Sequence, residues 1–418
     1  MVAIPRFALI SQELPAQTVT DIPAEIHREL QRIGLQDRIK PGARIGITVG
    51  SRGVYQIALI LRTVVDEVKN LGGQSFLIPA MGSHGGATAE GQIEVLKNLG
   101  VTEESVGAPI LSSMEVVRIG STDSGVPVHL DKYASEADGI IVIGRVKPHT
   151  DFHGPIESGL QKMLVIGLGK HKQALTNHGY GIKGLRDYIP QAAKVTLKQA
   201  SILFGLAILE NGYDRTAKIE AVPSEEIITR EPELLNEARG LMAKLPVEEL
   251  DLLVVGEIGK NFSGTGMDTN IIGRVAIYGE PEFGSPRIQY IVALNLSAQT
   301  HGNALGIGLA DFTTERVMKG IDYEATRQNV ITSSFIERGK IPLAFPGDRS
   351  AIQAAQRCLW LQDPEKARIM YIPNTLEISK IAVSESLLLA VSQRPNVKLL
   401  TQPQELKFDK DGNLLAPF

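Results

Sequence analysis

Residues 43–100 alternate between short apolar runs and longer amphipathic segments, and this alternation constrains the fold of the chain strongly. The run ARIGITVG (43–50) precedes YQIALILRTVVDEVKNLGG (55–73), in which apolar residues recur at helical spacing. The run SFLIPAMG (75–82) precedes TAEGQIEVLKNLG (88–100), with Thr88 as the expected helix cap. Alternating strands and helices imply parallel strands joined by helical crossovers. The sequence therefore predicts an α/β protein.

The length of the chain predicts two domains, because its 418 residues exceed the roughly 250–300 at which a single core stops growing. A polar, helical-looking segment between residues 221 and 251 is expected to join them. We therefore predict an N-terminal α/β domain, residues 1–245, that carries most of the candidate site residues named below, and a C-terminal α/β domain, residues 246–418, that closes the cleft. Parallel or mixed sheets flanked by helices are expected in both, with the active site in the interdomain cleft.

Composition excludes several classes of protein. The formal net charge is −4 and no basic run occurs, which disfavours nucleic acid as a partner. No apolar run approaches the ~20 residues of a membrane helix, and the first residues do not resemble a signal peptide. The single cysteine, Cys358, excludes intrachain disulfides and multi-cysteine zinc sites. We expect a cytoplasmic protein that acts on a small molecule.

Candidate functional residues follow the apolar runs, where ligands bind in open parallel sheets. Arg52 follows the first run and could pair with a carboxylate or phosphate, or be a solvated loop arginine. His84 lies among glycines in GSHGG and is as compatible with an ordinary loop histidine as with a functional one. His149 follows residues 139–146, and Lys260 follows residues 251–259.

The stretch between residues 145 and 179 holds four of the eight histidines. His149 and His153 would share one face of a helix, but Gly154 and the proline after it disfavour a helix there. Lys162 precedes the apolar run MLVIGLG and is either a reactive amine or an ordinary amphipathic lysine. His178 could ligate a metal or lie in an exposed turn; one histidine would need further donors from the protein or from a cofactor.

In order, these motifs resemble the nickel-pincer nucleotide-dependent lactate racemase superfamily of 2-hydroxyacid racemases and epimerases. They are Arg52, GSHGG around His84, KPH ending at His149, then Lys162 and His178. The sixteen positions between Lys162 and His178 are the most specific element.

The resemblance implies a cofactor and a role for each residue. The cofactor would be the nickel complex of pyridinium-3,5-bisthiocarboxylic acid mononucleotide, carried or contacted by Lys162, with His178 as nickel ligand. His84 and His149 would be acid and base on opposite faces of a 2-hydroxyacid whose C2 hydride passes to the pincer ring. Arg52 would hold an anionic group of substrate or cofactor. Cofactor-biosynthesis proteins would be partners.

Two departures from the lactate type point to a different substrate. The link TDFHGPIESGLQ (150–161) is longer than the lactate-type link, so His153 and Glu157 are candidates to set the substrate. After Asp268 and Asn270, this chain has Ile272, Gly273 and Ala276 where lactate enzymes place an aromatic, a glutamine and a lysine. Lys260 or Arg274 could bind the substrate instead, and smaller side chains would leave room for a bulkier 2-hydroxyacid.

Two alternatives stay open. A metal-dependent hydrolase would use His149, Asp151 and His153 as ligands and His84 as base. A non-catalytic protein that binds the cofactor or an organic acid would need Lys162 and His178 but not the other histidines. The sequence leaves the oligomeric state undetermined.

Overall fold

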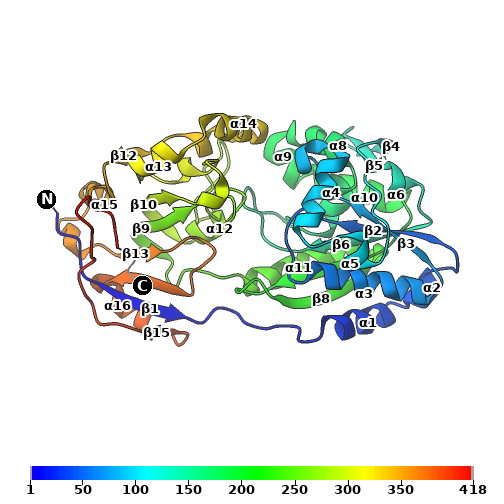
Figure 1. The fold of residues 1–418 in the computed structure, drawn as a ribbon, viewed down its shortest axis with the longest axis horizontal. Helices are drawn as coiled ribbons and strands as arrows, with labels where there is room; N and C mark the ends of the chain where they lie inside the picture. The colour runs from blue at the N-terminus through cyan, green and yellow to red at the C-terminus, as the bar shows by residue number, and fades with distance from the viewer. Residues whose placement is uncertain (1, 416–418) are drawn as a thin grey trace. The chain divides into compact units, whose positions relative to one another are not determined.

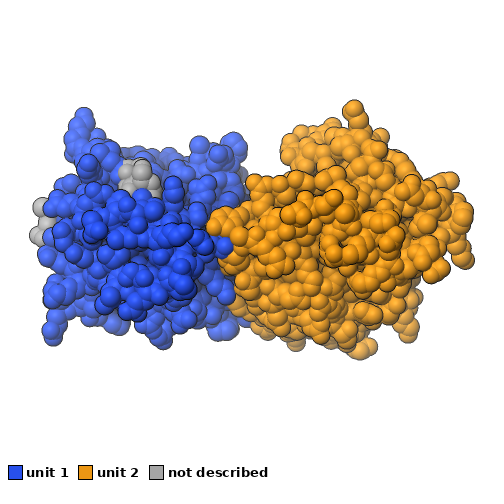
Figure 2. Space-filling model, turned by 90° about the horizontal axis from the view of Figure 1, so that it is seen from below, with its two compact units in different colours: residues 1–14, 243–418 blue, residues 15–242 orange. Residues whose placement is uncertain are grey.

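The computed structural model describes residues 2–415 and divides the chain into two compact units (Figure 2). Unit 1 comprises residues 1–14 and 243–418, and unit 2 comprises residues 15–242. Both are built of sheets with helices, so the predicted α/β class is confirmed. No helix within residues 2–415 is both long and apolar enough to span a bilayer.

The first strand, β1 (Phe7–Gln12), departs from the predicted domain division. It pairs antiparallel with β14 (Lys380–Ser384), from Phe7 opposite Ser384 to Ser11 opposite Lys380, and its other edge pairs with β15 (Val397–Leu399). The beginning of the chain therefore completes the C-terminal sheet. The predicted domain of residues 1–245 included residues 1–14, whereas in the structure these residues belong to unit 1.

Unit 2 is organised around a five-stranded sheet of order β3-β2-β6-β7-β8, in which β2, β3, β6 and β7 run parallel and β8 is antiparallel (Figure 1). Its strands are β2 (Arg44–Val49), β3 (Gln74–Pro79), β6 (Gly139–Arg145), β7 (Ile202–Glu210) and β8 (Thr216–Pro223). A separate hairpin comprises β4 (Val116–Ser121) and β5 (Pro127–Asp131).

Some helices of unit 2 begin at a side-chain cap, and the predicted cap Thr88 is among them. Asp21 caps α1 by accepting from the Ala24 N–H at 3.0 Å, and Thr88 caps α4 by accepting from the Gly91 N–H at 3.0 Å. The α-helices are α1 (Ile22–Arg32), α2 (Leu35–Arg38), α3 (Ile57–Asn70), α4 (Ala89–Asn98), α5 (Glu103–Val106), α6 (Lys132–Ser135), α7 (Leu160–Lys162), α8 (Lys170–His178), α9 (Gly181–Arg186), α10 (Tyr188–Gln199) and α11 (Ile227–Leu241). A π-helical turn, Met163–Gly167, continues α7.

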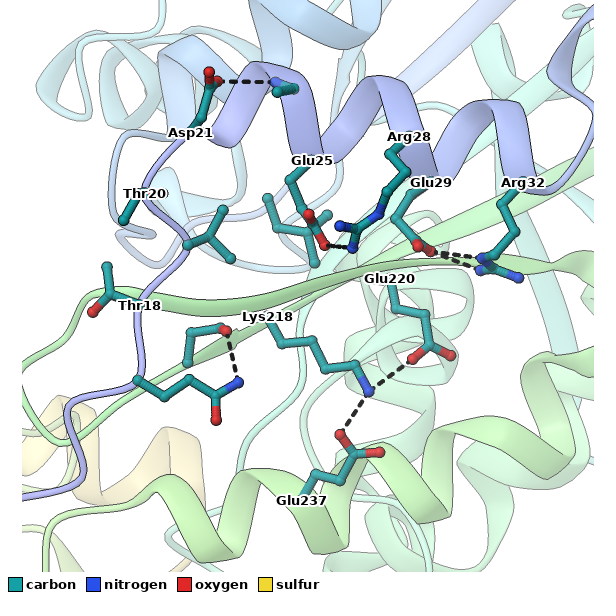
Figure 3. A pocket seen from close by; sticks show the side chains of 15 residues that line it. Thr18, Thr20, Asp21, Glu25, Arg28, Glu29, Arg32, Lys218, Glu220 and Glu237 are labelled. Atoms are coloured by element: carbon teal, nitrogen blue, oxygen red, sulfur yellow. Dashed lines mark hydrogen bonds and ion pairs between the residues drawn. The ribbon is translucent and has the colours of Figure 1, made fainter.

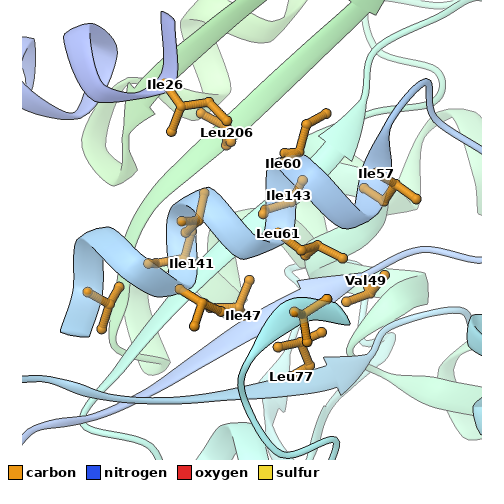
Figure 4. Close-up of a cluster of buried hydrophobic side chains, with 14 of the residues drawn as sticks. Ile26, Ile47, Val49, Ile57, Ile60, Leu61, Leu77, Ile141, Ile143 and Leu206 are labelled. Atoms are coloured by element: carbon orange, nitrogen blue, oxygen red, sulfur yellow. The ribbon is translucent and has the colours of Figure 1, made fainter. Parts of the chain in front are cut away.

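The main core of unit 2 lies between the sheet and α1 and α3 (Figure 4). The apolar face of α3 follows the helical period that its sequence predicts. Its buried residues are Ile57, Ile60, Leu61, Val64, Val65 and Val68. They pack against β2, β3, β6 and β7, and the near-continuous apolar β6 is buried along most of its length. This core fixes the carboxyl ends of β2, β3 and β6.

Unit 1 contains an eight-stranded sheet of order β12-β11-β10-β9-β13-β14-β1-β15. The first five of these run parallel, and β14, β1 and β15 pair antiparallel. Its other strands are β9 (Glu249–Ile258), β10 (Arg287–Leu296), β11 (Phe312–Thr314), β12 (Leu343–Phe345) and β13 (Ile369–Ile372). Its α-helices are α12 (Thr269–Ile272), α13 (Glu315–Gly320), α14 (Tyr323–Ser333), α15 (Asp348–Cys358) and α16 (Glu385–Ser392).

Candidate active site

Three candidate residues lie in loops at the carboxyl ends of adjacent parallel strands of unit 2. Arg52 follows β2, His84 follows β3 and His149 follows β6. Because the strand order is β3-β2-β6, these loops leave the same edge of one sheet side by side. The sheet thus brings together residues that are almost a hundred positions apart in the sequence.

The loop after β6 is closed by its own ends and by one buried carboxylate. The backbones of Lys147 and Ser158 exchange hydrogen bonds of 3.0 and 3.2 Å. Between them, the fully buried Glu157 side chain accepts from the backbone N–H of His149 at 2.6 Å and of Gly154 at 3.1 Å. Arg239 of α11 donates to the same carboxylate at 2.6 Å. Glu157 therefore holds the loop that carries His149.

The imidazole of His149 is oriented on both ring nitrogens. Its Nδ1 accepts from the backbone N–H of Asp151 at 3.1 Å, which directs the proton of the neutral ring to Nε2. Nε2 lies 2.6 Å from Nζ of Lys162, and the ring stacks on Phe152 at a centroid distance of 4.8 Å. A carboxylate oxygen of Asp151 lies 3.7 Å from Nδ1, where it would stabilise the imidazolium form.

Lys162 is the most strongly perturbed amine of this group. Withdrawal from water lowers its pKa to about 8, the positive charge of Arg52 adds to the decrease, and Asp151 and Glu157 oppose it. The amine is therefore deprotonated at a lower pH than an exposed lysine, which favours a nucleophilic or covalently linked lysine.

Arg52 and His178 belong to the same electrostatic cluster. Withdrawal from water and then the charge of Arg145 lower the pKa of Arg52, although much of its side chain is exposed. Arg145 is paired with Glu210, so Asp151 is the opposing negative charge that acts on Arg52. Withdrawal from water and then the charge of Lys162 lower the pKa of His178, which keeps its imidazole neutral, the form that binds a metal.

The His84 loop lies against the segment that follows Lys162. Gly82 packs against Ile166 of the π-helical turn and Ala174 of α8. The packing is close, since a Cβ atom added at position 82 would lie 3.0 Å from the Ile166 side chain. The side chain of His84 is exposed, and its backbone N–H donates to Met81. The loop therefore presents His84 beside the elements that carry Lys162 and His178.

A buried carboxyl group supports α7, the helix that ends at Lys162. Glu231 of α11 accepts from the backbone N–H of Gln161 at 2.9 Å. Burial raises the pKa of Glu231 to about 7, and its Oε1 is buried with no hydrogen-bond partner among residues 2–415. Gly159 is the residue before α7, and a Cβ atom added to it would lie 2.0 Å from Oε1 of Glu231. The start of α7 is therefore in close contact with the Glu231 carboxyl group.

Glu231→Gln is expected to stabilise the protein increasingly as the pH rises. The pKa of Glu231 is raised from 4.5 in the unfolded chain to about 7 in the folded protein. The proton on Glu231 therefore contributes its full stabilisation below about pH 4.5, and this contribution is lost as the pH rises to about 7. At about pH 8 the cost of ionisation is about 3 kcal/mol, which glutamine avoids. Urea unfolding of both proteins between about pH 5 and pH 8 measures the difference. A constant difference across that range would contradict the assignment.

The other predicted substrate residues do not join this cluster through any contact described. His153 is exposed on the loop after β6. Lys260 and Arg274 belong to unit 1, where Lys260 donates to Asn329. The guanidinium of Arg274 donates to Asp311 and to the carbonyls of residues 288, 289 and 309, contacts that hold the strands of unit 1 together.

A separate pocket of about 890 Å³ lies between the start of α1, β8 and α11 (Figure 3). None of the predicted site residues lines it. Its three basic side chains are paired with carboxylates: Arg28 with Glu25, Arg32 with Glu29, and Lys218 with Glu220 and Glu237. These pairs neutralise the positive charge that would attract an anion.

The donors in the cluster fit a metal that arrives with its own ligands. Within residues 2–415 no three His, Cys, Asp or Glu side chains are grouped so as to hold a metal ion, and the hydrolase alternative requires such a group. A neutral imidazole at position 178 and an amine at position 162 instead match a cofactor that brings further donors of its own.

The match to a known family agrees with this geometry. Residues 9–186 match the model of the lactate racemase N-terminal domain. This segment is therefore similar to the N-terminal domain of lactate racemase. A racemase-type function is therefore supported in general terms, and every residue of the cluster from Arg52 to His178 lies within the matched segment.

Two solved structures share the fold at low sequence identity. The lactate racemase apoprotein from Thermoanaerobacterium thermosaccharolyticum is 14% identical, with a TM-score of 0.51, and the match covers 86% of this chain and 93% of that one. A protein from Thermotoga maritima is 13% identical, also with a TM-score of 0.51, over 88% of this chain and 99% of that one. No curated protein matches the sequence.

Sequence reasoning missed two members of the cluster, Arg145 and Asp151, and the supporting residue Glu231. Arg145 ends β6, where the rule that ligands bind beyond strand ends could have found it. Asp151 entered only as a ligand of the alternative metal site, although it is the carboxylate that acts on Arg52, Lys162 and His178. Glu231 left no sequence signal, since it is one of several glutamates in a polar helix.

Proposed function

We propose that the protein inverts C2 of a 2-hydroxyacid, as a racemase or epimerase that uses the nickel-pincer nucleotide. The observation that carries the proposal is the cluster around Lys162, in which His149 lies 2.6 Å from its amine and Arg52, Asp151 and His178 act on it or on one another electrostatically. This arrangement combines an acid/base group, an anion-binding group, a reactive amine and a neutral metal ligand.

The cofactor would be held by residues that have the chemistry it needs. Lys162 would carry or contact the nucleotide through an amine of lowered pKa, and His178 would ligate nickel through its neutral imidazole. When bound, the nucleotide supplies an acceptor for the C2 hydride of the substrate, which no side chain of the chain can supply.

His149 would move the proton of the substrate hydroxyl. With Lys162 occupied by the cofactor, Nε2 of His149 would face the site. In the tautomer whose proton is on Nδ1, beside the Asp151 carboxylate, Nε2 would take the proton as the C2 centre is oxidised and return it when the 2-oxoacid is reduced again. The nearby Asp151 carboxylate stabilises the charged ring in between. His84 would do the same on the opposite face, so that the hydride can be returned to the other face of the 2-oxoacid once the planar intermediate has turned.

Arg52 would pair with the carboxylate of the substrate or with an anionic group of the cofactor. Arg52 is an exposed residue of the loop after β2, and Glu210 already pairs with the neighbouring Arg145, so Arg52 can offer a bidentate contact to an incoming anion. This contact would hold the planar 2-oxoacid while either face is reduced.

Loading and turnover test this proposal together. Protein co-expressed with the cofactor-building enzymes is expected to contain nickel and a tightly held or covalently linked nucleotide by metal analysis and mass spectrometry. That preparation is expected to interconvert the enantiomers of a 2-hydroxyacid larger than lactate. Protein that stays free of nickel and nucleotide would contradict the cofactor assignment, and zinc without nucleotide would favour the hydrolase instead.

The residues that replace the lactate-type pattern predict the substrate preference. Because Ile272, Gly273 and Ala276 lack the polar groups of lactate enzymes, kcat/KM is expected to be about tenfold higher or more for a larger 2-hydroxyacid than for lactate. Chiral chromatography of both reactions measures the ratio. Racemisation of lactate as efficient as that of any larger 2-hydroxyacid would contradict this preference.

A further inference from the structure

A fully buried lysine lies beneath the His84 loop. Lys170 begins α8, the helix that ends at His178, and its side chain has 0% exposure. Its Nζ donates to the carbonyl of Pro79 at 2.6 Å and to Oε1 of Gln92 at 2.7 Å. Asp131, equally buried, lies 3.7 Å away and balances its charge. The mechanism described above uses none of these groups.

Gln92 connects this lysine to the catalytic loop. Its amide is fully buried; the carbonyl oxygen accepts from Lys170, while Nε2 donates to the backbone carbonyl of Gly82 at 2.9 Å and to that of His84 at 3.3 Å. One amide therefore joins the first residue of α8 to both sides of Ser83. We call Lys170 and Gln92 the loop clamp.

The loop needs such an external contact, because its backbone is unusual. Gly82, Gly85, Gly86 and Ala87 all have positive φ values, between 56° and 66°, and Lys170 itself has a φ of 55°. A left-handed conformation is unfavourable for alanine and lysine, and persists where the surroundings determine it. Glycines at three of the four loop positions allow many other conformations, so the two hydrogen bonds of Gln92 select one.

We propose that Lys170 and Gln92 are positioning residues that fix the His84 loop relative to the helix that bears His178. The proposal rests on the proposed function, in which His84 acts as acid or base on a substrate held beside His178. Without the clamp, His84 would sample positions away from the substrate, and proton transfer requires hydrogen-bond reach. A misplacement of about 1 Å can cost about 10²-fold in rate.

Gln92→Glu separates positioning from simple packing. A carboxylate at position 92 still accepts from Lys170, so the buried lysine keeps its partners, but it cannot donate to the carbonyls of residues 82 and 84. Gln92→Met removes both contacts. Gln173→Met is the matched control: Gln173 is an equally buried amide on α8, but it contacts His129, Pro127 and Asn177 and not the loop. Lys170 itself is left intact, since its loss would strand the Asp131 carboxylate.

Two measurements test the clamp. Amide hydrogen exchange of the full chain without cofactor is expected to be about tenfold faster or more over residues 82–87 in Gln92→Glu and Gln92→Met, and unchanged in Gln173→Met. In cofactor-loaded protein both Gln92 variants are expected to lower kcat by about ten- to a hundredfold, with KM changed by less than about threefold.

Each measurement can contradict a different part of the proposal. Exchange over residues 82–87 that stays as slow in Gln92→Glu as in the unmodified chain would overturn the clamp, whatever the activity. Faster exchange with an unchanged kcat would overturn the role of the clamp in placing His84. If the unmodified, loaded protein turns over no 2-hydroxyacid, the proposed function fails, and the exchange measurement alone decides whether Lys170 and Gln92 hold the loop.

Discussion

Replacing His149 with alanine is expected to slow the interconversion of enantiomers by about 10²–10⁴-fold, the usual contribution of a general acid or base. Nickel content should not change, because the proposed nickel ligand is His178. His149 is oriented by the backbone of Asp151 and by stacking on Phe152, and its Nε2 lies 2.6 Å from Nζ of Lys162, the proposed cofactor lysine. Chiral chromatography and metal analysis of the same loaded preparation measure both quantities.

Two other histidines provide the comparison for His149→Ala. His153→Ala, on the same loop but with an exposed side chain, is expected to retain nickel and to test the predicted role of that residue in substrate choice. His178→Ala is expected to lose nickel and therefore activity. Full metal content in His178→Ala would refute the ligand assignment, and near-normal turnover in His149→Ala would refute its role as acid or base.

Glu157→Ala is expected to destabilise the protein by about 2–5 kcal/mol, because two backbone N–H groups lose their acceptor, at about 1–3 kcal/mol each. The Glu157 side chain is fully buried, and it accepts from two backbone N–H groups and from Arg239. Without it, these donors lose their acceptor and the loop after β6 loses its internal support. Denaturant unfolding measures the free energy change.

Arg239→Met and the double variant Glu157→Ala/Arg239→Met complete a double-mutant cycle. In Arg239→Met the fully buried Glu157 carboxylate loses its counter-charge but keeps its two backbone N–H donors, so a loss of similar size is expected. The double variant should be destabilised by less than the sum of the two single variants, because neither charge remains without its partner. Strict additivity, or a loss below about 1 kcal/mol for Glu157→Ala, would show that the carboxylate does not hold the loop.

The parts of the structure that follow from local pattern could be predicted. The apolar runs at residues 43–50 and 139–146 contain β2 and β6, the run at residues 75–82 covers all of β3 but its first residue, and the helical spacing after the first run matches α3. Because these strands are adjacent and parallel, the loops that follow them leave one edge of the sheet, and Arg52, His84 and His149 lie in those loops.

Contacts between distant parts of the chain could not be predicted in the same way. Glu157 was expected to set the substrate because it lies in an unusual link, but its carboxylate meets Arg239 and two backbone groups. Nothing in the sequence near residue 157 indicates a partner 82 positions away. The pairing of β1 with β14 is equally non-local, and a six-residue apolar strand does not specify which sheet it joins.

The place of β1 has a consequence for the order in which the chain can fold. Its antiparallel partner β14 begins at Lys380, so a growing chain must carry residues 7–12 unpaired until almost all of the sequence has been made. The segment between, residues 15–242, has its own core and sheet and can form while the remainder is still being synthesised. The eight-stranded sheet, which needs both ends of the chain, is then the last part to close, and its contacts of high sequence separation are expected to be the slowest to form.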